Sequence, residues 1–322
     1  MQGNGDKAEK RYVLLSGGVG GAKLALGLSR ILPPSALTII ANTGDDFEHL
    51  GLHISPDLDT LLYTLAGEVN IDTGWGRRDE TWHCMDALEK LGGETWFRLG
   101  DRDLATHLER SRRLSAGESL SEVTAALCKK MGVEIRLLPM SDQKVRTRLT
   151  TDRGVLDFQH YFVRDAAAPV ITRLEYAGAG TARASDGVRE ALGDPQLAGL
   201  VIAPSNPYLS INPILAIPDI RKAIKETSAP RVAVSPIVAG AAIKGPTAKI
   251  MRELGHEISS RTVADHYGTL IDHLLIDAAD SACANGIEHS GPAVTVCNTV
   301  MTSDKDKMDL ARRVIASCEM SS

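Results

Sequence analysis

A run of glycines between a strand-like and a helix-like segment constrains this chain most. Tyr12 to Leu15 have the composition of a buried strand and lead into Ser16-Gly17-Gly18-Val19-Gly20-Gly21, and a helical pattern follows from Ala22 to Leu32. Glycines at such a junction let the backbone turn tightly and approach a ligand closely. The N-terminus of the following helix offers free N–H groups and the positive end of a dipole. The pattern predicts a site for a phosphate-bearing ligand; a glycine-rich turn that only packs strand against helix is the alternative.

The glycine run matches neither standard nucleotide fingerprint. Read as G-x-G-x-x-G from Gly18, its third glycine falls on Lys23, and the G-K-[ST] ending of a P-loop is absent. The second predicted strand, Leu37 to Ala41, ends in Asn42 and not in the acid that binds ribose in dinucleotide folds. Both differences count against an NAD-dependent dehydrogenase.

Acidic residues follow this second strand and open the next helix. Asp45 and Asp46 lie where open α/β sheets bind ligands, although Asn-Thr-Gly-Asp-Asp is also a common turn composition. Ser55 and Pro56 predict the start of a helix that runs to about Ala66. Within it, Asp57 and Asp59 point about 200° apart, so they cannot serve one site equally. We expect Asp59 to join Asp45 or Asp46 in a Mg²⁺ site completed by substrate phosphates, and Asp57 to stabilise the helix N-terminus.

Tryptophan and arginine concentrate in the segment after this helix. All three tryptophans fall within GWGRRDETW (74–82) and WFRLGDRD (96–103). Aromatic rings beside arginines suit a flat ligand that carries charge or phosphate. A packed helical cap with solvated charges is the alternative. The surrounding residues, about 68–132, read as an inserted helical segment.

The remaining chain predicts a doubly wound, mainly parallel Rossmann-like sheet. Residues 133–177 read as a small antiparallel excursion with strands at 133–138, 145–150, 155–163 and 171–176 and a turn at 152–154. From Ser185 strands and helices alternate. Two later strands end in Ser205-Asn206-Pro207 and Ser235-Pro236, which either face a ligand or are plain turns. We expect one domain over 11–322 behind a disordered lead-in over 1–10.

Composition excludes several classes of protein. The net charge is −5 with no Lys/Arg tract, so no nucleic-acid partner is expected. No apolar run approaches the length of a membrane helix. Five widely spaced cysteines without a C-x-x-C pair argue against structural zinc and suit the cytoplasm.

A series of motifs in one order then points to a family. They are SGGVGGAKLALGL, NTGDD, ISPDLDTLLYTLAG, GWGRRDETW, LGDRDLATHLERS, LPMSD, APSNPYLSINPIL and SPIVAGAAIKGP. Together they resemble the 2-phospho-L-lactate transferase family of coenzyme F-420 biosynthesis over almost the whole chain. GWGRRDETW and GDRDLATHL look most like its phosphoenolpyruvate-using bacterial branch.

The resemblance implies a Mg²⁺-dependent phosphotransferase. A guanosine diphospho-activated three-carbon acid, made by a partner guanylyltransferase, would donate its phospho-acid moiety to the ribityl hydroxyl of the deazaflavin FO and release GMP. The acid is left open among 2-phospholactate, phosphoenolpyruvate and 3-phosphoglycerate, as is a homodimer. A non-catalytic nucleotide-sugar-binding regulator of the same fold is the alternative.

The resemblance also assigns roles to residues of this chain. Asp45, Asp46 and Asp59 would be catalytic, with Asp45 and Asp59 on the metal. The expected ligand contacts are Asp59, Arg98, Trp75 and Arg102 for FO, and Gly18, Gly20, Gly21, Lys23, Ser205, Asn206 and Ser235 for the nucleotide and its phosphates.

Overall fold

The computed structural model describes residues 9–243, 245–289 and 291–320. The predicted disordered lead-in, 1–10, therefore lies outside the described residues except for its last two positions.

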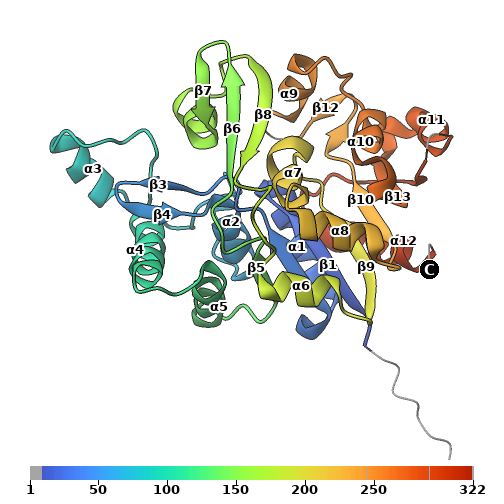
Figure 1. Cartoon of the computed structure of the whole chain (residues 1–322), viewed down its shortest axis with the longest axis horizontal. Helices are drawn as coiled ribbons and strands as arrows, with labels where there is room; N and C mark the ends of the chain where they lie inside the picture. The colour runs from blue at the N-terminus through green and yellow to red at the C-terminus, as the bar shows by residue number, and fades with distance from the viewer. Residues whose placement is uncertain (1–8, 244, 290, 321–322) are drawn as a thin grey trace, which may run out of the picture.

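Seven parallel strands form the central sheet, in the order β14-β13-β10-β9-β1-β2-β5 (Figure 1). Most of their residues are apolar and buried, as expected of a parallel sheet covered on both faces. The fold class predicted from the sequence is confirmed. The strands are β1 Arg11–Ser16, β2 Leu37–Ala41, β5 Arg136–Pro139, β9 Leu197–Ile202, β10 Arg231–Val234, β13 His273–Asp277 and β14 Ala293–Cys297.

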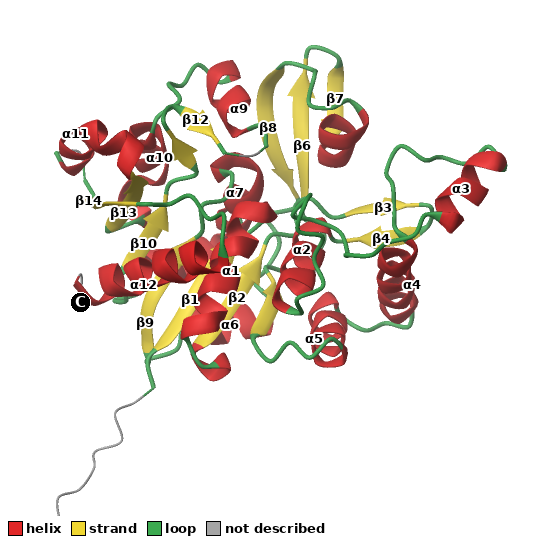
Figure 2. Ribbon diagram, turned by 180° about the vertical axis from the view of Figure 1, so that it is seen from behind, coloured by secondary structure: helices red, strands yellow, loops and turns green. Residues whose placement is uncertain are grey.

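Helices cover both faces of the sheet because successive strand residues point to opposite sides. Leu14 lies in one hydrophobic core, and its neighbours Val13 and Leu15 lie in the other. The Leu14 side is covered by α1 Gly18–Ile31, α2 Pro56–Leu65, α5 Leu120–Lys130 and α12 Asp304–Met320 (Figure 2). The Val13 side is covered by α6 Asp186–Leu192, α7 Asn212–Leu215, α8 Pro218–Glu226, α9 Thr247–Glu253, α10 Ser260–Tyr267 and α11 Ala284–Glu288.

The chain reverses its direction across the sheet between β1 and β9. From β1 it proceeds to β2 and β5 on one side, and then crosses to β9, β10, β13 and β14 on the other. The carboxyl ends of two strands that lead apart leave a crevice, which is where open α/β sheets bind ligands. The glycine run follows β1 and Ser205-Asn206 follows β9, so both motifs reach this switch point.

A three-stranded antiparallel sheet stands above the carboxyl ends of the parallel strands (Figure 1). Its order is β7-β6-β8, with bounds Gly154–Asp157, Arg146–Thr151 and Ile171–Ala177. Two details of the predicted excursion are wrong. Residues 133–138 do not belong to it, because β5 pairs in parallel with β2 at the edge of the main sheet. The expected strand over 155–163 stops at Asp157, and a π-helical turn occupies His160–Arg164.

The inserted segment between α2 and β5 contains α3 His83–Lys90, α4 Asp101–Ser115 and α5. A hairpin not predicted from the sequence, β3 Phe47–His49 and β4 Leu52–Ile54, extends toward it, and α3 lies at the periphery (Figure 1). A second short hairpin joins β11 Ile237–Val238 to β12 Ala241–Ala242. In the described residues no helix is long and apolar enough to span a bilayer.

Candidate active site at the strand switch point

The glycine run forms the first turn of α1. The sequence predicts a helix from Ala22, but the helix begins at Gly18, which has a φ of 64°. A side chain at Gly20 would collide with the carbonyl oxygen of Pro204, so glycine is required where the ends of β1 and β9 meet. The N-cap residue Gly17 offers no side chain to the helix. The α1 N-terminus therefore presents backbone N–H groups to the crevice.

Two residues after β9 shape the same crevice. The Ser205 hydroxyl donates to the Gly17 carbonyl at 2.7 Å and accepts from the Gly17 N–H at 3.4 Å, which joins the two strand ends. The Asn206 side-chain oxygen caps the following turn by accepting from the N–H groups of Tyr208 and Leu209. The Asn206 amide nitrogen is buried with no hydrogen-bond partner in the described part of the chain, so a donor is left for a ligand.

Asp57 reaches from α2 to the N-terminus of α1. Its Oδ1 accepts the Gly18 N–H at 2.7 Å and its Oδ2 accepts from the Asn42 amide at 2.9 Å. Asn42 is held in turn, because its Oδ1 accepts the Gly44 N–H at 2.7 Å. Asp57 therefore stabilises the N-terminus of α1 and not, as predicted from the sequence, that of its own helix α2. Ser55 occupies the N-cap of α2 without a side-chain cap, and its hydroxyl donates to Asp46 Oδ2 at 2.9 Å.

Asp45 and Asp46, in the turn that follows β2, lie beside Asp57 of α2. Both carboxylates are buried, and one oxygen of each has no hydrogen-bond partner among the described residues. Asp46 Oδ2 also lies 3.1 Å from His53 Nε2. Burial and the charge of Asp57 raise the pKa of Asp45 well above its usual range. Burial likewise raises the pKa of Asp57 to about 6, although Asn42 and Gly18 oppose the shift by hydrogen bonding. Three acids therefore concentrate negative charge in one buried place.

Asp59 lies apart from this cluster in a buried ion pair. Both of its carboxylate oxygens accept from the guanidinium of Arg110 on α4, which is 2% exposed. His107 Nδ1 lies 3.7 Å from Asp59 and His107 Nε2 lies 3.2 Å from Asp103, which also accepts from the Tyr63 hydroxyl at 2.6 Å. This network fastens the inserted segment to α2. The geometry therefore favours Asp57 over Asp59 as the partner of Asp45 and Asp46.

The other residues expected at the site are spread more widely. The Lys23 ammonium donates to the Met301 carbonyl at 2.9 Å. The Ser235 hydroxyl lies 2.9 Å from Ser260 and accepts the Ile237 N–H. In the inserted segment, the Arg98 guanidinium lies over the Trp82 ring at 4.7 Å, and Arg102 donates to the Arg78 carbonyl. Trp75 is 54% exposed, so its ring is free to contact a ligand.

The carboxylate cluster fits a hard cation only in part. No group of three or more His, Cys, Asp or Glu within the described ranges is arranged to hold a metal ion by itself. The unpartnered oxygens of Asp45 and Asp46 are nevertheless the donors that Mg²⁺ takes, and Mg²⁺ usually binds through one or two carboxylates plus phosphate and water oxygens. The donor set thus suits an ion that arrives with a phosphate-bearing substrate.

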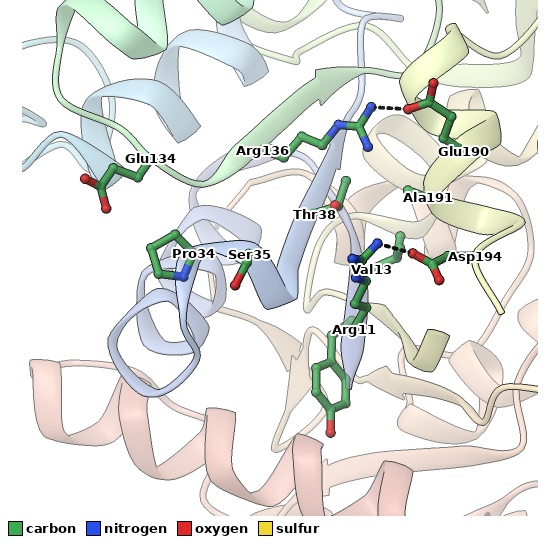
Figure 3. Close-up of a pocket in the computed structure, with 11 residues that line it drawn as sticks. Arg11, Val13, Pro34, Ser35, Thr38, Glu134, Arg136, Glu190, Ala191 and Asp194 are labelled. Atoms are coloured by element: carbon green, nitrogen blue, oxygen red, sulfur yellow. Dashed lines mark hydrogen bonds and ion pairs between the residues drawn. The ribbon is translucent and has the colours of Figure 1, made fainter. Parts of the chain in front are cut away.

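A cavity of about 490 Å³ lies at the amino ends of the parallel strands, opposite the crevice (Figure 3). The amino ends of β1, β2 and β5 line it, and the ion pairs Arg11–Asp194 and Arg136–Glu190 cross its wall. Since ligands of open α/β sheets bind at the carboxyl ends, this cavity is separate from the candidate active site.

Comparison with known proteins identifies the family. The family profile described as "2-phospho-L-lactate transferase CofD" matches residues 12–317. The chain belongs to this family. A phosphoenolpyruvate transferase of Kitasatospora aureofaciens is 43% identical over 316 residues, covering 96% of this chain and 98% of that protein. One from Mycolicibacterium smegmatis is 42% identical over 299 residues, covering 86% and 91%.

A solved structure supports the fold of this 2-phospho-L-lactate transferase family member. A Bacillus halodurans protein superposes with a TM-score of 0.62 over 95% of this chain and 99% of its own, at 17% identity. At that identity the likeness concerns the fold alone. The family membership establishes a transferase of coenzyme F-420 biosynthesis.

Three residues of this site are not identified by the sequence motifs. Asn42 marks the end of a strand without a ribose-binding acid, and only the structure shows that its buried amide holds Asp57. The sequence places Asp57 at the N-terminus of its own helix, whereas it binds that of α1. Gln159, whose amide donates to the Asp45 carbonyl at 3.3 Å, lies in a segment read as a strand, so no motif marked it.

Proposed function

We propose that this protein transfers a phosphoenolpyruvyl moiety from a guanosine diphospho-activated donor to the terminal ribityl hydroxyl of FO, with release of GMP. The convergence of Asp45, Asp46 and Asp57 on the glycine-built N-terminus of α1 carries the proposal. The names of the bacterial relatives support phosphoenolpyruvate as the acid in preference to 2-phospholactate or 3-phosphoglycerate.

The reaction forms one P–O bond and breaks another. The ribityl hydroxyl oxygen attacks the phosphorus that carries the acid. The bond between this phosphorus and the oxygen that bridges the two donor phosphates breaks, and GMP leaves with the bridging oxygen. Such a transfer requires positioning and charge neutralisation more than covalent catalysis. A bound Mg²⁺ would supply neutralisation of phosphate charge. The half-buried start of α1 at Gly18 and Gly20 would cradle the diphosphate, whereas Gly21 is buried and lets this turn pack closely against Ser16 and Ser205.

The hydroxyl proton needs an acceptor at the site. Asp57, whose pKa is raised to about 6 chiefly by burial, is ionised near neutral pH and still basic enough to accept a proton. Asp45 and Asp46 would contribute oxygens to Mg²⁺. Arg98, Arg102 and Trp75 would contact the ring of FO, with Asp59 as a support held by Arg110.

The test combines purified protein, FO, GTP, Mg²⁺ and the donor-forming guanylyltransferase. Phosphoenolpyruvate, 2-phospholactate and 3-phosphoglycerate are offered separately and products are read by mass. We expect the phosphodiester of FO and enolpyruvate, abolished in Asp45→Asn and retained in the exposed control Asp72→Asn. A product from another acid alone would overturn the choice of acid. No product with any acid, from a folded protein that binds guanine nucleotide, would favour the non-catalytic regulator.

A further inference from the structure

One arginine beside the carboxylate cluster, Arg146, has no counter-ion among the residues that the structure describes. Arg146 begins β6 of the antiparallel sheet, and the next residue, Thr147, donates its N–H to the Gly44 carbonyl at 2.8 Å. This bond fixes the start of β6 against the turn that carries Asp45 and Asp46. The Arg146 side chain is half-buried, and its Nη1 donates to the carbonyls of Thr43 at 3.3 Å and Val145 at 2.7 Å.

The rest of the guanidinium is unengaged. Within the described residues, no carboxylate lies at ion-pair distance from Arg146, and its Nε and Nη2 have no hydrogen-bond partner. Its charge still lowers the pKa of Asp45, against the larger upward effects of burial and Asp57. Arg146 is therefore near the acid cluster without being neutralised by it. By contrast Arg148, two residues further along β6, has Asp157 at 3.5 Å.

A half-buried, unpaired cation is costly unless an anion completes it. Nε and Nη2 form one edge of the guanidinium, and two parallel N–H groups on one edge match the two oxygens of a carboxylate. Thr43, whose carbonyl holds Nη1, adds a second unused donor. Its hydroxyl is buried, on a residue only 2% exposed, and has no partner in the described chain.

We propose that Arg146 binds the carboxylate of the transferred acid. The inference rests on the proposed function and adds to it the residue that recognises the acid. The phosphates would lie toward Asp45, Asp57 and the glycines, where a cation neutralises them, and the carboxylate toward Arg146. Since 2-phospholactate and phosphoenolpyruvate both carry this carboxylate next to the phosphate-bearing carbon, Arg146 selects the class of acid and leaves the choice within it to other contacts.

The test measures binding of FO phosphodiesters by the fluorescence of the deazaflavin. Two synthetic ligands are compared: the enolpyruvyl phosphodiester, which has the carboxylate, and the methyl phosphodiester, which lacks it. We expect Arg146→Met to weaken the first by about tenfold or more, as for lost hydrogen bonds to a charged group, and to leave the second within about twofold. Arg146→Lys should also weaken the first, because lysine cannot make the bidentate contact.

Arg148→Met is the matched control, since it removes an arginine from the same strand and should change neither affinity. Equal weakening of both ligands by Arg146→Met, or wild-type affinity for the carboxylate ligand in both Arg146 variants, would overturn the inference while the wild-type enzyme still makes its product. If the wild type binds neither diester and does not form the enolpyruvyl phosphodiester, the proposed function fails instead.

Discussion

Replacing Asp57 with asparagine should stabilise the protein at alkaline pH and destabilise it at acid pH. Burial raises the pKa of Asp57 to about 6 from 3.8, so the folded state binds this proton more tightly than the unfolded chain. Stability from this group is therefore lost as pH rises from about 4 to about 6, and the loss is complete above that. A shift of about 2 pKa units corresponds to about 3 kcal/mol. This is the cost of burying the ionised Asp57 carboxylate at pH 8, and Asp57→Asn removes that cost.

The hydrogen bonds of Asp57 oppose this gain. An asparagine oxygen can still accept the Gly18 N–H, but its amide would face the Asn42 amide, whose own oxygen is engaged by Gly44. One lost buried hydrogen bond costs about 1–2 kcal/mol at every pH. The net effect is a gain of about 1–2 kcal/mol at pH 8 and a loss of similar size near pH 4.

Thermal unfolding across pH measures this crossing. Unfolding entropy of about 2.1 cal/mol/K per residue over 322 residues gives about 0.7 kcal/mol/K. The variant should therefore unfold about 1–3 °C higher at pH 8 and about 1–3 °C lower near pH 4. The exposed Asp72→Asn controls for removal of a charge. A difference between Asp57→Asn and wild type that does not change with pH would refute the reasoning.

Two further substitutions test the residues that surround the site. Asp59→Asn leaves the fully buried Arg110 without its counter-ion, so we expect the free energy of unfolding to fall by about 3–5 kcal/mol and the unfolding temperature by about 4–7 °C. Asp59→Leu combined with Arg110→Met should recover more than half of that stability, and no recovery would contradict the role given to the ion pair. Gly20→Ala should abolish soluble folded protein or sharply lower its unfolding temperature, because the added carbon meets the Pro204 carbonyl. Gly180→Ala is the control, since Gly180 has open space around it and the variant should unfold like the wild type. Equal behaviour of the two variants would contradict the close approach of β1 and β9.

The parallel core could be predicted from the sequence because each βα unit repeats the same pattern. The predicted strand at 37–41 coincides with β2, and the predicted alternation of strands and helices after Ser185 includes α6, β9, α8 and β10. β5 has only four residues, too few to distinguish the continuous apolar run of a parallel strand from the alternation of an antiparallel one, so the partner of β5 could not be predicted from residues 133–138. The hairpin of β3 and β4 has three residues in each strand, too few for alternation to show.

The exchange of roles between Asp57 and Asp59 has a different cause. Positions 57 to 64 of α2 are all buried, because the helix lies between the sheet and the inserted segment. A helix buried on every side has no exposed face to reveal which residues point where. The helical spacing separates the two acids correctly, but the partner of each comes from a distant part of the chain: Gly18 for Asp57 and Arg110 for Asp59.

Two pairs of acids near the crevice thus have opposite consequences. Asp59 and Asp103 are engaged by ion pairs with Arg110 and His107 and by a hydrogen bond from Tyr63, and they hold the inserted segment in place. Asp45 and Asp57 have no cationic partner among the described residues, and burial raises the pKa of both. Since an unpaired buried charge costs free energy, a ligand that neutralises this cluster stabilises the fold as it binds. Binding and folding stability are therefore coupled at the strand switch point, and removal of charge there should raise stability as it lowers activity.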